Sequence, residues 1–122
     1  AAHDLSEGGL AAAAAEMAIG GRLGARIDVA LAPTDGALDV TRRLFSESQS
    51  RFLLEVPSDR LDDLAANLRD VPFAVVGEVT AEPWLQLGDG ARLVARVAVA
   101  DAERAWKRPL DLDGTLCAEA GR

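Results

Sequence analysis

The feature that most constrains the fold is the junction of a short polar segment with a run of alanines near the N-terminus. Residues 2–10 read Ala-His-Asp-Leu-Ser-Glu-Gly-Gly-Leu, and Ala11 to Ala15 follow without a break. Alanine has the highest helix propensity of all residues, so the run predicts a helix over residues 7–19. Ser6 is a suitable N-cap, because its hydroxyl can accept a bond from a free backbone N–H.

Gly8 and Gly9 stand in the first turn of this predicted helix. Each costs about 1 kcal/mol relative to alanine there, so the pair needs a reason. The first N–H groups of a helix lack internal partners and lie at the positive end of its dipole, and glycine lets an anion approach them closely. We therefore predict a phosphate-binding loop. The alternative is a plain helix start, in which the Ser6 side chain bonds the N–H of Gly9 and the glycines permit tight packing.

His3 is the only histidine of the chain. A single histidine can act as a general base near neutral pH. It has no nucleophile beside it, which favours the other interpretation, a ring hydrogen-bonded to a neighbouring loop.

A second polar segment, Ser46-Glu47-Ser48-Gln49, precedes the apolar run at residues 52–56. Ligand-binding loops often follow or precede strands in this way. The alternative is an ordinary helix-to-strand turn, and the spacing leaves both interpretations open.

Apolar periodicity and turn residues predict an α/β fold with one mixed sheet covered by helices. In the first helix, Leu10, Ala14 and Met17 form the buried stripe, and Gly20-Gly21 ends it. The run at residues 52–56 is expected to be a central strand. Further strands are expected over 25–29 and 73–79, and Gly77 in the second indicates either a bulge or a close backbone approach. Residues 84–87 and 93–97 are expected to form a hairpin around Gly88-Asp89-Gly90. Helices are expected over 38–44, over 100–107 with Trp106 packed on the body, and after Ser58, which would cap a helix that buries Leu61, Leu64, Ala65 and Leu68.

Length and charge limit the classes of function. The 122 residues suggest one domain, over 1–108, followed by a disordered tail over 109–122. A net charge of −7 argues against a nucleic-acid partner, and no apolar run is long enough to cross a membrane. The single cysteine, Cys117, fits a reducing compartment such as the cytoplasm. No set of residues has the spacing of a metal site, and the start at Ala1, inside a loop, suggests a piece of a longer protein.

Three segments together resemble a known family: AHDLSEGGLAAAAAEMAIGGRLGARIDV from residue 2, LFSESQSRFLLEV from residue 44 and VVGEVT from residue 75. They are similar to the C-terminal lobe of the large subunit of phosphoribosylformylglycinamidine synthase, a member of the aminoimidazole ribonucleotide synthetase superfamily. The resemblance covers most of residues 1–108, and the tail matches nothing.

The resemblance implies a loosely ferredoxin-like lobe of an ATP- and glutamine-dependent ligase of purine biosynthesis. ATP and Mg²⁺ would be bound mainly by N-terminal synthetase lobes of the parent chain, and a glutaminase subunit or domain would supply ammonia. This lobe would hold no catalytic residue and would be inactive alone. It would close a cleft for a phosphoribosyl substrate or a structural nucleotide with two loops, formed by His3, Asp4, Ser6, Glu7, Gly8 and Gly9 and by Ser46, Glu47, Ser48 and Gln49.

Two alternatives remain open at this point. One is the corresponding lobe of another superfamily member, such as a thiamine-phosphate kinase, a selenophosphate synthetase or a hydrogenase-maturation protein. The other is a free-standing regulatory or interaction module with a ferredoxin-like sheet.

Overall fold

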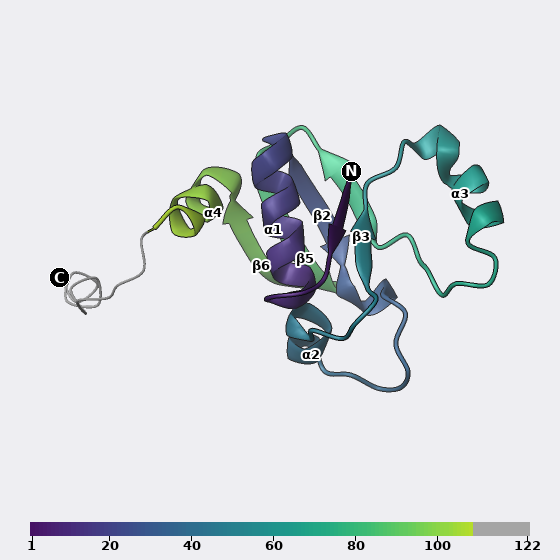
Figure 1. The fold of residues 1–122 in the computed structure, drawn as a ribbon. Coiled ribbons are helices and arrows are strands. Elements are labelled where there is room, and N and C mark those ends of the chain that lie inside the picture. The colour runs from purple at the N-terminus through teal and green to yellow at the C-terminus, as the bar shows by residue number, and fades with distance from the viewer. Residues whose placement is uncertain (109–122) are drawn as a thin grey trace.

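The computed structural model describes residues 1–108, and its strands form two sheets (Figure 1). The expectations for residues 109–122, including Cys117, lie outside the described part. The larger sheet has the order β4-β2-β5-β6, and the smaller one pairs β1 with β3. The strands are β1 (Ala2–Asp4), β2 (Gly24–Asp28), β3 (Phe52–Leu54), β4 (Gly77–Thr80), β5 (Trp84–Asp89) and β6 (Arg92–Ala98).

The longest helix, α1 (Gly9–Gly21), lies across one face of the larger sheet (Figure 1). The other helical elements are η1 (Val29–Leu31), α2 (Val40–Phe45), η2 (Ser58–Arg60), α3 (Leu61–Asn67) and α4 (Val99–Trp106). None of the helices in this part of the chain is long and apolar enough to cross a membrane.

The core lies between α1 and the larger sheet. Val29, just after β2, is fully buried, and Leu10 on α1 is 2 % exposed. Side chains alternate between the two faces of a strand, so every second residue of β2 and β5 faces the helix. The core cluster contains Leu5, Leu10, Ala13, Ala14, Ile27, Val29, Leu44, Leu85 and Leu87.

The larger sheet is mixed, as predicted: β2 runs parallel to β5, and β4 and β6 pair antiparallel at the edges. Gly77 opens β4 opposite Ile27. A Cβ on this glycine would lie 1.9 Å from the backbone oxygen of Arg26. The predicted close backbone approach is therefore confirmed, and so is the hairpin of β5 with β6.

The expectation of one sheet with a central strand at residues 52–56 is wrong. The first three residues of this run form β3, which within residues 1–108 pairs only with β1, and β1 occupies residues expected to be loop. Phe52 is 65 % exposed and Leu54 is 44 % exposed. A continuous apolar run is typical of a strand buried on both faces, but the side chains cannot reveal how many partners the strand has.

Three expectations for the helices are also wrong. Leu61, Leu64, Ala65 and Leu68 were expected to be buried, yet all four are only partly buried, and α3 stands apart from α1 (Figure 1). Ser58 lies in η2 and caps no helix by its side chain. Trp106, expected to pack on the body, is 63 % exposed. Apolar periodicity identifies the apolar face of a helix but not what covers it.

Candidate functional site

The first predicted loop turns into α1 through two glycines in the left-handed conformation. Gly8 is the N-cap with a φ of 77°, and Gly9 has a φ of 61°. The prediction that Ser6 caps the helix with its side chain is wrong. Instead, the Ser6 carbonyl accepts a hydrogen bond from the N–H of Gly9 at 3.3 Å. Hydrogen bonding with the Ser6 side chain is the largest cause that lowers the pKa of Asp4.

Gly9 lies against the end of α2. A Cβ at this position would lie 2.8 Å from both the carbonyl carbon of Phe45 and the backbone oxygen of Ser46. Real Cβ atoms do not approach backbone atoms so closely, so only glycine fits without a shift. Tight packing is therefore one reason for this glycine, and the packing brings the first predicted loop against the second.

Glu47 joins the two predicted loops directly. Its Oε1 accepts a hydrogen bond from the backbone N–H of Gly8 at 2.8 Å, across 39 residues of sequence. One amide of the predicted cradle is thus already bonded to a carboxylate, the type of group that helix N-termini favour. The side chains of Glu7, Ser48 and Gln49 are exposed around this contact.

Arg51, which is not among the predicted site residues, holds the base of the second loop. Its Nη1 donates to the backbone oxygen of Ser46 at 3.1 Å and to the Ser46 hydroxyl at 2.8 Å. The Arg51 carbonyl accepts from the N–H of Leu5 at 2.9 Å. Arg51 therefore contacts both loops. Its signal in the sequence is weak, because a lone arginine at the start of a strand is common.

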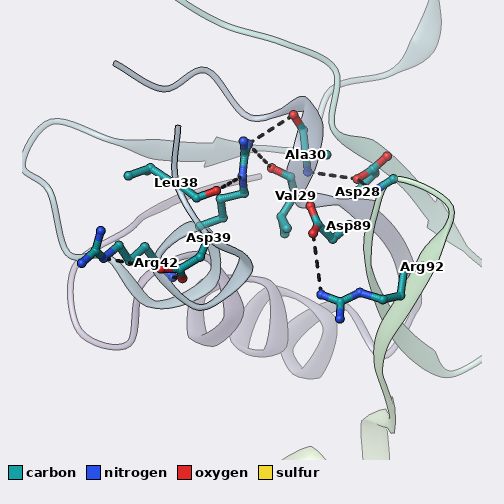
Figure 2. A network of polar contacts seen from close by, with 10 residues as sticks. Asp28, Val29, Ala30, Leu38, Asp39, Arg42, Asp89 and Arg92 are labelled. Carbon is teal, nitrogen blue, oxygen red and sulfur yellow. Dashed lines mark hydrogen bonds and ion pairs between the residues drawn. The ribbon is translucent and has the colours of Figure 1, made fainter. Parts of the chain in front are cut away.

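A second polar network fixes α2, which leads into Ser46 (Figure 2). Arg43 donates to the backbone oxygens of Leu38, Val29 and Ala30. The Asp28 carboxylate accepts from the N–H of Ala30 at 3.0 Å and from the N–H of Gly90 at 2.9 Å. These bonds tie the end of β2 to α2 and to the β5–β6 hairpin. The second loop is thereby anchored to the sheet.

His3 bonds to its own strand and to α1. Its Nδ1 lies 2.7 Å from the backbone oxygen of Asp4, and its Nε2 lies 2.8 Å from Oε2 of Glu16. The bond to the Asp4 carbonyl is the largest cause that raises the pKa of His3, followed by the bond to Glu16. The ring is hydrogen-bonded, as expected, but to a helix side chain rather than to a neighbouring loop.

Two other features of residues 1–108 lie apart from these loops. A shallow hollow of about 490 Å³ is lined by β2, β4 and the β5–β6 hairpin, including Arg26, Gly77, Gln86 and Arg92. None of the predicted site residues lines it. Within the described part of the chain, no group of three or more His, Cys, Asp or Glu side chains is arranged to hold a metal ion.

Comparison with known proteins shows the family to which the chain belongs. The model of the family "AIR synthase related protein, C-terminal domain" matches residues 1–90. The chain belongs to this family, and the mixed α/β fold agrees with that assignment. The resemblance seen in the opening and Phe-Ser-Glu-Ser motifs is thereby confirmed at the level of the domain.

The curated relatives identify the protein that the chain resembles within this family. The phosphoribosylformylglycinamidine synthase subunit PurL of Alkaliphilus metalliredigens is 38% identical over 111 residues, which are 89% of this chain and 14% of the relative. The PurL subunit of Thermococcus sibiricus is 43% identical over 82 residues, 67% of this chain and 11% of the relative. The chain therefore spans less than a sixth of the length of these relatives.

Solved structures of PurL also match this chain. Thermotoga maritima PurL complexed with ATP matches with a TM-score of 0.76 and 29% sequence identity, over 83% of this chain and 18% of that one. T. maritima PurL complexed with FGAR matches with the same TM-score and identity, over 83% of this chain and 17% of that one.

Proposed function

We propose that this chain is the C-terminal lobe of a phosphoribosylformylglycinamidine synthase that closes a phosphate- or nucleotide-bearing cleft. The names of the relatives support this enzyme over a thiamine-phosphate kinase, a selenophosphate synthetase or a free-standing module. The parent reaction would convert formylglycinamide ribonucleotide to its amidine with ATP and ammonia. Chemistry of this kind depends on positioning and on stabilisation of developing charge.

The observation that carries the proposal is the bond between Gly8 and Glu47, because it brings both predicted loops to the start of α1. In the proposed site His3, Asp4, Ser6, Glu7, Gly8 and Gly9 form one wall, and Ser46, Glu47, Ser48 and Gln49 form the other. The serine hydroxyls are suitable donors to phosphate oxygens, whereas the N–H groups of Gly8 and Gly9 already bond to Glu47 and to the Ser6 carbonyl. Solved structures of PurL with ATP and with FGAR support a ligand of this class.

The proposed site offers serine hydroxyls to a phosphate, but its walls also carry carboxylates, which repel one. Glu47 and Glu7 add negative charge, which Mg²⁺ would have to neutralise if a polyphosphate is held here. We infer that ATP and Mg²⁺ are held mainly by N-terminal synthetase lobes of the parent chain. A glutaminase subunit or domain would supply the ammonia, and the whole assembly would work in the cytoplasm.

Titration calorimetry tests the binding role. The 122-residue chain is titrated separately with ATP, ADP and inorganic phosphate. Binding is expected, and the double variant S48A/Q49A is expected to weaken it, since both side chains are exposed beside the start of α1. The control is S58A, which removes an exposed hydroxyl from η2. Absence of binding, or equal affinity in S48A/Q49A and the unsubstituted 122-residue chain, would contradict the proposed site.

A turnover assay tests the absence of catalytic residues. The chain is mixed with ATP, Mg²⁺, formylglycinamide ribonucleotide and ammonia, and no amidine is expected, because the catalytic contacts are proposed to lie in other lobes. Measurable product that depends on the chain would show that this lobe catalyses the reaction.

A further inference from the structure

Both nitrogens of the His3 ring face groups that can only accept a hydrogen bond. Nδ1 lies 2.7 Å from the backbone oxygen of Asp4, and Nε2 lies 2.8 Å from the Glu16 carboxylate. A carbonyl and an ionised carboxylate carry no hydrogen to donate, so each ring nitrogen must carry one. A neutral imidazole has only one N–H. The geometry therefore selects the imidazolium, the doubly protonated cation.

The contact between the His3 ring and the Glu16 carboxylate forms a bridge that joins β1 to α1 and closes a loop of the chain. His3 lies on β1, and Glu16 lies on α1, 13 residues further along the chain. The loop of residues 5–8 connects the two elements and contains the left-handed turn at Gly8. The other end of this loop is held by the bond from Gly8 to Glu47. Any change in the distance between β1 and α1 is therefore transmitted to the first loop.

The charges that face the ring come from two elements. Glu16 approaches from α1, and the Asp4 carboxylate lies 3.7 Å from Nδ1 on the same strand. On β3, the residue paired with His3 is Leu53, which carries no charge. The His3 side chain is 28% exposed, so the ring exchanges protons with solvent while it is partly shielded from salt.

We propose that His3 is a positioning residue that works as an imidazolium, tying β1 to α1 and holding the loop of residues 5–8, and that loss of its proton loosens this loop. The bridge is independent of any ligand. Its consequence, a phosphate site that is better ordered below the pKa of His3 than above it, rests on the proposed function.

The test is a pH titration of the 122-residue chain by ¹⁵N NMR. Because His3 is the only histidine, its ring signals are assigned without ambiguity. We expect a titration midpoint above that of a free histidine, and a lower midpoint in E16Q, because a glutamine NH₂ can donate to a neutral ring nitrogen. E55Q is the matched control. It also removes one carboxylate, but Glu55 joins Ala1 only by its backbone in the described contacts, so no shift is expected.

Hydrogen exchange gives the readout that links the ring to the loop. The protection of the Gly8 amide, corrected for intrinsic exchange, is expected to fall as the ring of the parent chain loses its proton, and to show no such step in H3Q. Circular dichroism shows whether each variant is folded.

The possible results test the bridge, the positioning role and the proposed function separately. The imidazolium bridge between His3 and Glu16 is overturned if the His3 ring of the unsubstituted chain titrates with the midpoint of free histidine, or if E16Q leaves that midpoint unchanged. The positioning role of His3 is overturned if the hydrogen-exchange protection of the Gly8 amide does not change as the ring titrates. The expected titration and protection step without binding of ATP or phosphate at any pH supports the bridge and contradicts the proposed function alone.

Discussion

The region around α1 and the segment that carries α3 are held together by different kinds of contact. Around α1, hydrogen bonds join residues far apart in sequence, such as Gly8 with Glu47 and Leu5 with Arg51. In residues 57–71, the described bonds join near neighbours, such as Arg60 with Asp63, and no residue of this segment is buried. The candidate site therefore depends on tertiary contacts, whereas α3 depends on local ones.

The largest effect is expected from truncation of the core. Leu85 on β5 is 4% exposed, so L85A should lower the free energy of unfolding by about 2–5 kcal/mol through lost burial and a cavity. Leu64 on α3 is only half-buried, and L64A should cost roughly 1 kcal/mol or less. Urea unfolding of both variants measures the contrast. Equal losses would show that α3 is as well packed as the core.

Two glycines of α1 differ in the same way, since among the residues described Gly9 has neighbours distant in sequence and Gly20 has none. Gly9 combines a positive φ with backbone atoms 2.8 Å from the place of a Cβ, so G9A should lower stability by about 1–3 kcal/mol and displace the second loop. Gly20 has open space around it, and G20A should raise stability by about 0.5–1 kcal/mol through helix propensity. Thermal unfolding measures both. A neutral G9A would contradict the close contact of α1 with the end of α2.

A third pair compares a distant contact with a local one. E47A removes the bond to the N–H of Gly8 and should cost about 1 kcal/mol, the usual value for a lost helix cap. D63A removes an exposed ion pair with Arg60 within one turn and should cost about 0.5 kcal/mol or less. Chemical denaturation, with the amide signal of Gly8 as a local probe, separates them. An unmoved Gly8 signal in E47A would contradict the described bond.

The smallest effect is a pH dependence confined to the first region. The pKa of His3 is raised from 6.5, mainly by the bond to the Asp4 carbonyl and by Glu16. A raised folded-state pKa means that the ring contributes its full stability below the unfolded pKa and loses it as the pH rises through the folded value. The stability difference between the unsubstituted chain and E16Q should therefore be full below about pH 6.5 and shrink as the pH rises through the raised folded-state pKa of His3. The difference between the parent chain and D63A should stay constant over this range.

The elements that could be predicted from the sequence are those set by interactions between residues close together in the chain. The alanine run predicted α1, and apolar periodicity with turn residues predicted the β5–β6 hairpin, because propensity and turn chemistry act within a few residues. Ser6 was assigned as a cap by the same kind of reasoning and proved wrong. Its surroundings include Asp4 and a left-handed turn, and local preference alone does not decide which of several partners a hydroxyl chooses.

The candidate site shows the same division. The two loops were identified from their residue types, but the bond of Glu47 to Gly8 and the anchors Arg43 and Arg51 were not. These contacts exist because α2 packs against the start of α1. Nothing in a loop of small polar residues specifies the partner that lies across from it.

The sequence alone was enough to predict that a helix follows the alanine run, that residues 84–87 pair with 93–97 in a hairpin, and which family the chain resembles, because each of these inferences depends on residues close together in the chain. Only the tertiary structure decided that β3 pairs at the surface, that α3 stays uncovered, and that Glu47 and Gly8 meet. The physical reason is that strand partners, burial and distant hydrogen bonds are set by how whole elements pack, and one apolar pattern is compatible with several such arrangements.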